Sequence, residues 1–150
     1  MNDLATVGQI DRRTYLGSSD VAAILGVSPW KTALDVYFSK LGEPEIITPE
    51  KQKLFARGKR MEPVVLDMLI EESPELIITK RSTPQDPNRY IDPEYDFMAA
   101  EIDFEWDDNG EIENGEVKTV HPFAAKKWGE VDTDEIPVEY AARTMYGLMV

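Results

Sequence analysis

The chain has 150 residues, 42% of them hydrophobic, which is enough to form one hydrophobic core in a single domain over residues 1–150. It contains no cysteine, which excludes disulfides and thiolate-bound zinc or iron–sulfur sites. The net charge of -13 argues against a simple nucleic-acid-binding module, because phosphate contacts require lysine and arginine.

The N-terminal residues lack a basic start followed by an apolar run, and no segment has the roughly 18 apolar residues that a membrane span needs. We therefore expect a cytoplasmic protein that makes no contact with a membrane. The basic residues are unevenly distributed, with a local concentration at positions 51–60. This basic run is compatible with a phosphate-contacting surface and equally with a solvated helix face.

Three helices are predicted in the first half of the chain. The first spans residues 19–26, because it starts at a serine, which is a good N-cap, and stops at a glycine. The second lies between Thr32, a capping residue, and Gly42. The third extends from about residue 49 to 72 and carries an apolar stripe, and we expect Gly58 and Pro63 to divide or kink it.

Strands are predicted mainly in the second half. Residues 76–80 favour a strand, and the proline-rich segment 82–93 favours a loop. Residues 97–106 and 111–120 are predicted as two strands that meet at Asn109-Gly110, a favoured two-residue hairpin turn. A short helix near 126–128 and a helix from 137 to 150 follow. The sum is an α/β (α+β) fold in which helices flank a central mixed sheet.

The last predicted helix is apolar up to the end of the sequence, without a polar tail or a capping glycine. This ending is typical of the front part of a longer protein, so we expect the chain to be truncated at its C-terminus.

The predicted hairpin brings acidic residues together. With Asn109-Gly110 as the turn, Asp103 lies opposite Glu116 and Glu101 lies opposite Lys118. Because side chains alternate between the faces of a strand, all four project from the same side, with Ile102 and Val117 on the other. Cross-strand neighbours have Cβ atoms about 4.5–5.5 Å apart, near enough for two carboxylates to share a divalent cation. Such a pair beside a lysine suits metal-assisted phosphodiester hydrolysis.

Two alternatives remain open for this hairpin. Asn114-Gly115 is a second candidate turn, and a bulge near residue 114 would also shift the register. Whatever the register, Asp103 and Glu116 have a second interpretation as surface carboxylates on an acidic protein.

Short motifs occur in a fixed order along the chain: Gly17–Asp20, Ala23–Trp30, Gly58–Pro63, Ile102-Asp103, Glu116–Lys118, and Ile136-Pro137 followed by Tyr140. This ordered set, from about Arg12 to Val150, resembles the YqaJ viral recombinase family. That family contains lambda exonuclease and shares the restriction-endonuclease-like (PD-(D/E)xK) core.

The resemblance implies a catalytic metal site. Asp103 and Glu116 would be ligands of Mg²⁺, for which Mn²⁺ can substitute, and the backbone carbonyl of Val117 would add a further ligand. Lys118 would complete the Asp…Glu-x-Lys signature of the family. Glu62 matches a helical glutamate at the same site. Its alternative interpretation is structural, as a carboxylate in the first turn of a helix ahead of Pro63.

The resemblance also implies a site for DNA ends and shows departures from the family. Ser19, with Arg12 or Arg13 upstream, resembles the part of the family that receives a terminal 5′ phosphate, although a serine at a helix start is also an N-cap. Arg143 stands where the family usually has a glutamine, and Glu101 stands where small or hydroxyl residues are common. Both are expected to modulate activity.

The implied function is a Mg²⁺-dependent 5′-to-3′ exonuclease that acts on double-stranded DNA ends during phage recombination. The implied partner is a single-strand annealing protein, the implied assembly is a ring-shaped homotrimer, and the location is the cytoplasm of a bacterial host of the phage or prophage. An endonuclease with the same core is one alternative. Another, which the net charge favours, is a catalytically impaired acidic relative that mimics DNA or inhibits a nuclease.

Overall fold

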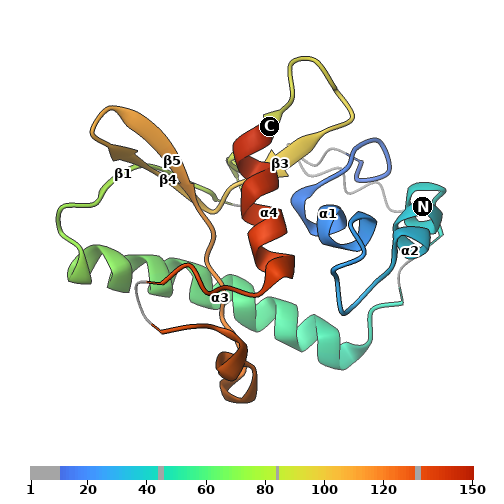
Figure 1. The fold of residues 1–150 in the computed structure, drawn as a ribbon, viewed down its shortest axis with the longest axis horizontal. Helices are drawn as coiled ribbons and strands as arrows, with labels where there is room; N and C mark the ends of the chain where they lie inside the picture. Colours follow the sequence, from blue (N-terminus) through green and yellow to red (C-terminus); the bar gives the residue numbers. More distant parts are fainter. Residues whose placement is uncertain (1–10, 44–45, 84, 131–132) are drawn as a thin grey trace.

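The computed structural model describes residues 11–43, 46–83, 85–130 and 133–150. Its elements, in chain order, are α1 (Ser18–Ile24), α2 (Ala33–Lys40), α3 (Pro49–Glu72), β1 (Ile77–Arg81), β2 (Arg89–Ile91), β3 (Ala99–Glu101), β4 (Phe104–Asp108), β5 (Glu111–Gly115), the 3-10 helix η1 (Pro122–Lys127) and α4 (Val138–Met149) (Figure 1). The predicted α+β class is confirmed. Among the described helices, none combines the length and apolar character needed to cross a membrane.

The strands form two small antiparallel sheets. One has the order β1-β4-β5, and the other pairs β2 with β3. Within the described residues, the parallel pairing expected of a mixed sheet is confined to one bridge between Leu16 and Met98. This bridge joins the segment before α1 to the approach of β3.

The predicted strand over residues 97–106 is wrong, because the chain breaks it between Glu101 and Phe104 into β3 and β4, which belong to different sheets. The backbone of the break bonds to the preceding loop instead. The Ile102 N–H donates to the Asn88 carbonyl at 2.8 Å, and the Asp103 carbonyl accepts from the Ser82 N–H at 2.9 Å.

The break corrects the expected facing of Glu101. It pairs with Arg89 across β2 and β3, and the two side chains form an ion pair, so Glu101 does not lie opposite Lys118. Glu101 has this partner because the positive charge of Arg89 lies directly opposite it on β2. The loop expected over residues 82–93 likewise contains a strand, because β2 pairs with β3.

The third predicted helix has the expected bounds but is not divided. α3 begins after Thr48, whose side chain accepts a hydrogen bond from the Lys51 N–H, and it continues past Gly58 and Pro63 as one helix of 24 residues. A proline inside a helix removes one backbone donor. The packing of the following residues on the sheet offsets that loss, since Val65, Leu66 and Leu69 lie in a hydrophobic cluster.

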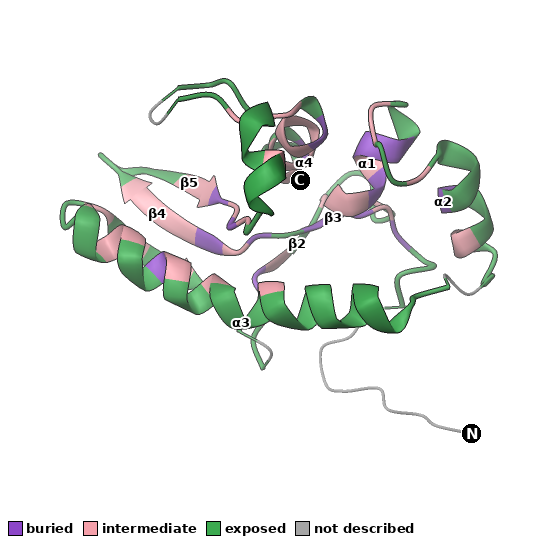
Figure 2. Cartoon of the chain, turned by 90° about the horizontal axis from the view of Figure 1, so that it is seen from below, coloured by how far each residue is buried: buried purple, intermediate pink, exposed green. Residues whose placement is uncertain are grey.

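Two hydrophobic clusters hold the fold together. In the first, Leu66 of α3 packs against Phe104 and Val117. In the second, Ala100 and Ile102 pack against Tyr146 of α4. The simple register predicted that Ile102 and Val117 oppose each other across one sheet. They lie in different clusters instead, so this prediction is wrong. The hairpin of β4 and β5 lies between α3 and α4, each of which covers it from its own side (Figure 2).

Candidate active site

The turn between β4 and β5 sets the register of the hairpin. Asn109 and Gly110 both have positive φ, 56° and 96°, as a two-residue turn of this type requires. Asp108 pairs with Glu111, and the ladder continues in steps to Phe104 and Gly115. The alternative turn at residues 114–115 is thus not formed, and the pairing of β4 with β5 has no bulge. The irregularity in this sheet lies instead in β1, between Ile78 and Lys80.

Asp103 lies just beyond the end of this ladder and is fixed by its side chain. Its Oδ2 accepts a hydrogen bond from the Val117 N–H at 2.7 Å. Burial raises the pKa of Asp103 to about 6, and the negative charges of Glu116 and Glu62 act in the same direction, while Lys118 and the Val117 N–H oppose them. Asp103 is therefore a half-buried carboxylate whose charge is not balanced by its surroundings.

Glu116 has a different environment, because two cations bind it. Lys118 Nζ lies 2.5 Å and Arg143 Nη2 lies 2.9 Å from the same oxygen, Oε1. Lys118 Nζ also donates to the Val117 carbonyl at 3.1 Å. The acid pair, Asp103 and Glu116, thus combines one uncompensated carboxylate with one that is held by positive side chains.

The donors of the acid pair fit a hard divalent cation. Two carboxylates and the Val117 carbonyl supply oxygen ligands, and Mg²⁺ is usually held by one or two carboxylates together with water and substrate oxygens. Burial, and then the charge of Glu116, disfavour the ionised form of Asp103, and a bound cation would relieve this cost. Within the described residues, no three acidic or histidine side chains are arranged to hold a metal. Glu62 therefore acts on Asp103 by its charge and does not join a three-acid cluster.

A small hollow of about 80 Å³ is linked to the acid pair through Arg143, which lines it and also binds Glu116. Arg12, Ser19, Glu101 and Arg143 are among the residues that line it. Arg12 Nη2 donates to Ser19 Oγ at 2.6 Å, so the two residues predicted to receive a phosphate are in direct contact. Arg13, the other predicted candidate, instead pairs with Asp11 at 2.5 Å and does not line this hollow.

A buried ionic cluster is joined to the lining of the hollow, and it was not predicted from the sequence. Asp20 is 3% exposed and accepts hydrogen bonds from Lys31 Nζ at 2.7 Å and Lys40 Nζ at 2.8 Å. Burial alone would raise the pKa of Asp20, but these ammonium groups and the Gly17 N–H lower it below its usual value. Lys40 Nζ also donates to the Arg12 carbonyl at 2.7 Å, which ties the cluster to the lining of the hollow.

Three aromatic rings stack beside α4. The ring centroids of Trp30 and Trp128 lie 5.8 Å and 5.0 Å from that of Tyr140. Trp30 is 64% exposed, so it is not a core residue although its ring contacts Tyr140.

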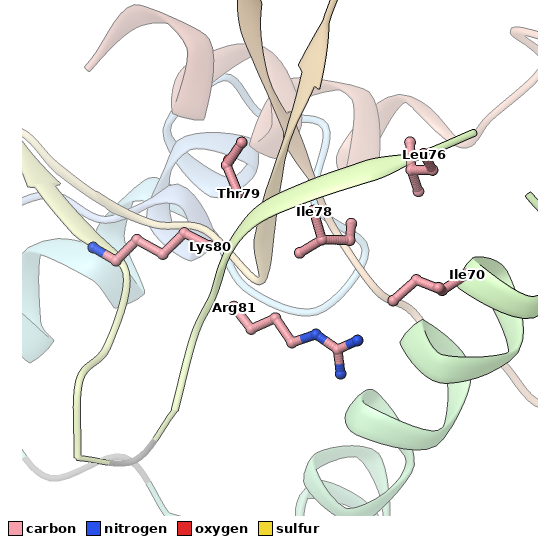
Figure 3. A pocket seen from close by; sticks show the side chains of 6 residues that line it. All are labelled: Ile70, Leu76, Ile78, Thr79, Lys80 and Arg81. Carbon is pink, nitrogen blue, oxygen red and sulfur yellow. The ribbon is translucent and has the colours of Figure 1, made fainter. Parts of the chain in front are cut away.

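A larger hollow, of about 360 Å³, lies elsewhere, between the end of α3 and β1. Figure 3 shows its lining side chains, Ile70, Leu76, Ile78, Thr79, Lys80 and Arg81. Its apolar members belong to the first hydrophobic cluster, and Arg81 is paired with Asp67 at 2.7 Å. It contains no member of the acid pair, so we assign it to packing and not to chemistry.

The α+β architecture, with an acidic pair beside a lysine at the end of a hairpin, is consistent with the restriction-endonuclease-like class. The YqaJ-like viral recombinase domain matches residues 9–150, and the chain belongs to this family. It is 27% identical over 141 residues to the Bacillus subtilis (strain 168) protein "Uncharacterized protein YqaJ". That match covers 94% of this chain and 40% of the relative. The chain therefore spans less than half of the length of this curated relative.

Proposed function

We propose that this chain is the catalytic core of a Mg²⁺-dependent deoxyribonuclease that degrades linear duplex DNA from 5′ ends during phage recombination. The observation that carries the proposal is the acid pair. Asp103 is half-buried, its pKa is raised by burial and then by the charge of Glu116, and Lys118 lies in ion-pair contact with Glu116. Two carboxylates that repel each other beside a lysine form a site poised for a cation and an anionic substrate.

In this proposal Asp103, Glu116 and the Val117 carbonyl hold the cation, which activates water and stabilises charge on the phosphate when bound. Lys118 orients the nucleophile and donates to the scissile phosphate. Its Nζ contacts Glu116 and the Val117 carbonyl, so it lies among the groups that would hold the cation. Glu62 lies close enough to act on the charge of Asp103 and would accept a proton from a bound water.

We assign the terminal 5′ phosphate to the small hollow. Arg12 and Ser19 supply a guanidinium and a hydroxyl in contact with each other, and both are strong partners for phosphate oxygens. The exposed basic residues on the first half of α3 would follow the duplex. They are Lys51, Lys53, Arg57, Lys59 and Arg60. The single-strand annealing partner and the ring-shaped homotrimer are proposed from the family alone, and the molar mass in solution tests the trimer.

A second candidate function is supported by one contact. Because Arg143 binds Glu116 at 2.9 Å, the carboxylate is occupied by a cationic side chain, as would be expected of a relative that no longer binds metal. Combined with the net charge of -13, this favours a DNA mimic or an inhibitor of a nuclease. Such a protein would bind a basic partner and cleave nothing.

The deciding experiment is a digestion time course on linear and circular duplex DNA labelled at either end, with Mg²⁺, Mn²⁺ or EDTA. Metal-dependent loss of linear DNA with early release of the 5′ label supports the proposal, whereas cleavage of circles indicates an endonuclease. Asp103→Ala and Glu116→Ala must each abolish cleavage. Asp96→Asn, which changes an exposed carboxylate in the loop before β3, is the matched control and should cleave normally. A folded chain that binds Mn²⁺ without cleaving DNA would refute the nuclease.

A further inference from the structure

Arg143 of α4 stands between the acid pair and the small hollow. Its Nη2 binds Glu116 Oε1 at 2.9 Å, and the same side chain lines the hollow together with Arg12 and Ser19. One guanidinium therefore reaches both the proposed metal ligand and the proposed phosphate site.

The guanidinium of Arg143 has an unused donor. Its Nε is buried and has no hydrogen-bond partner, although the side chain as a whole is 28% exposed. A buried N–H without an acceptor is unfavourable, so an acceptor that arrives beside it is stabilised. The fork of N–H groups on arginine matches two oxygens of a phosphate, which a single ammonium cannot do.

The charges around the hollow also favour an anion. Arg12 and Arg143 both line it, and Glu101 is the one carboxylate among its lining residues. Glu101 already pairs with Arg89 across β2 and β3, so its charge is largely compensated. Two guanidinium groups that face one small hollow repel each other until an anion lies between them.

We propose that Arg143 couples the arrival of a 5′ phosphate in the hollow to the binding of a cation at the acid pair; this rests on the proposed function and deepens it. Without DNA, Arg143 competes with the cation for Glu116. A phosphate in the hollow draws the guanidinium toward itself and so removes one of the two cationic side chains that hold Glu116. Phosphate and cation then bind cooperatively, and because such coupling is reciprocal, each tightens the other by the same factor. The metal site is completed when a DNA end is present.

The test measures Mn²⁺ affinity by electron paramagnetic resonance on the intact chain. Titrations are run alone and with a short duplex whose phosphorothioate linkages resist cleavage, bearing either a 5′ phosphate or a 5′ hydroxyl. In the wild type, the 5′-phosphorylated duplex should tighten Mn²⁺ binding roughly tenfold, within the range typical of allosteric coupling, and more than its hydroxyl twin does.

Three variants separate coupling from charge. Arg143→Gln should bind Mn²⁺ more tightly without DNA and show no further gain from the 5′ phosphate. Arg143→Lys keeps the charge but lacks the fork, so it should retain competition for Glu116 and lose the coupling. Arg81→Gln removes an arginine that is paired with Asp67 and does not line the small hollow, and it should behave as the wild type does.

Equal coupling in the wild type and Arg143→Gln would overturn the inference while leaving the nuclease intact. A Mn²⁺ affinity that rises as much in Arg81→Gln as in Arg143→Gln would also overturn it, because general charge would then explain the change. If the wild type binds no Mn²⁺, or binds it unchanged after Asp103→Ala, the proposed function itself fails.

Discussion

The carboxylate of Asp103 is joined to the backbone N–H of Val117 at 2.7 Å, at the point where backbone pairing between β4 and β5 has ended. The side chain thus extends the hairpin by one step beyond its last backbone pair, Phe104 with Gly115. This bond fixes one oxygen of Asp103 and leaves the other for a ligand. It also holds the start of the Glu116–Lys118 segment at a set distance from the acid pair.

Replacing Asp103 by asparagine should abolish cleavage and stabilise the metal-free protein. The folded pKa of about 6 lies above the ordinary 3.8, so stability falls as pH rises between those two values. At pH 7 the variant should gain up to about 3 kcal/mol of unfolding free energy, because it carries no buried charge and keeps the oxygen that accepts from Val117. Urea unfolding in EDTA measures this. Near pH 4 the gain should nearly vanish, and an equal gain at both pH values would contradict the cause given.

Ser19→Ala should weaken the preference for 5′-phosphorylated ends. The change removes the hydroxyl that contacts Arg12 at 2.6 Å in the hollow. We expect KM for phosphorylated duplexes to rise by about tenfold, which corresponds to one charge-assisted hydrogen bond, while hydroxyl ends are digested as before. Ser39→Ala, whose hydroxyl bonds within α2 to the Val36 carbonyl, is the control. An equal loss on both kinds of end would argue against a phosphate site.

Gly115→Ala should destabilise the hairpin. A Cβ at this position would overlap the ring of Phe104, which lies over the glycine across the strand pair. Displacing that ring disturbs its contacts with Leu66, at a cost of roughly 1–3 kcal/mol. Thermal unfolding checks this, and adding Phe104→Leu to the variant should recover part of the loss.

Gly58→Ala provides a comparison of opposite sign. Gly58 lies inside α3 and a Cβ there would have no neighbour within 4 Å. Alanine should therefore raise the unfolding free energy by about 0.5–1 kcal/mol, the ordinary gain for replacing a helical glycine. A lower unfolding free energy in this variant would show that the position of Gly58 in α3 does not have room for a methyl group.

Lys40→Met should impair the selection of DNA ends indirectly, by loosening the position of Arg12 in the hollow. It removes one of the two ammonium groups that bind Asp20, and it frees the Arg12 carbonyl. Breaking a buried ion pair costs roughly 3 kcal/mol, so stability should drop and the preference for 5′ phosphate should fall, while Mn²⁺ binding persists. Lys31→Met is the matched control. Lys31 binds the other carboxylate oxygen of Asp20, Oδ1. The Lys31→Met variant should therefore lower stability without changing the preference for 5′ phosphate.

Local chemistry made the hairpin predictable. Asn109-Gly110 accommodates two positive φ values at little cost, and once this turn forms the register of both strands follows. The starts of α2 and α3 were also predictable from local sequence. The hydroxyl groups of Thr32 and Thr48 each accept a hydrogen bond from a backbone N–H three residues later.

The break at Ile102-Asp103 depended on distant partners. The sequence around it continues an apolar and polar alternation, which favours one long strand. Hydrogen bonds from the loop that contains Ser82 and Asn88 decide otherwise, and no local pattern signals them. The same holds for the contact of Arg143 with Glu116, since the two residues lie on elements that are distant in the sequence.

The break also sets how the acid pair responds to events elsewhere in the molecule. Ile102, just before Asp103, belongs to the cluster with Tyr146 of α4, and Phe104, just after it, belongs to the cluster with Leu66 of α3. Regions of a protein can open independently when they rest on separate packing units. Loosening either unit would change the spacing at Asp103 before the whole domain unfolds. The rate of hydrogen exchange at the Val117 amide therefore reports how well the two clusters hold Asp103 in place. Mutations inside either cluster can impair the acid pair without touching it.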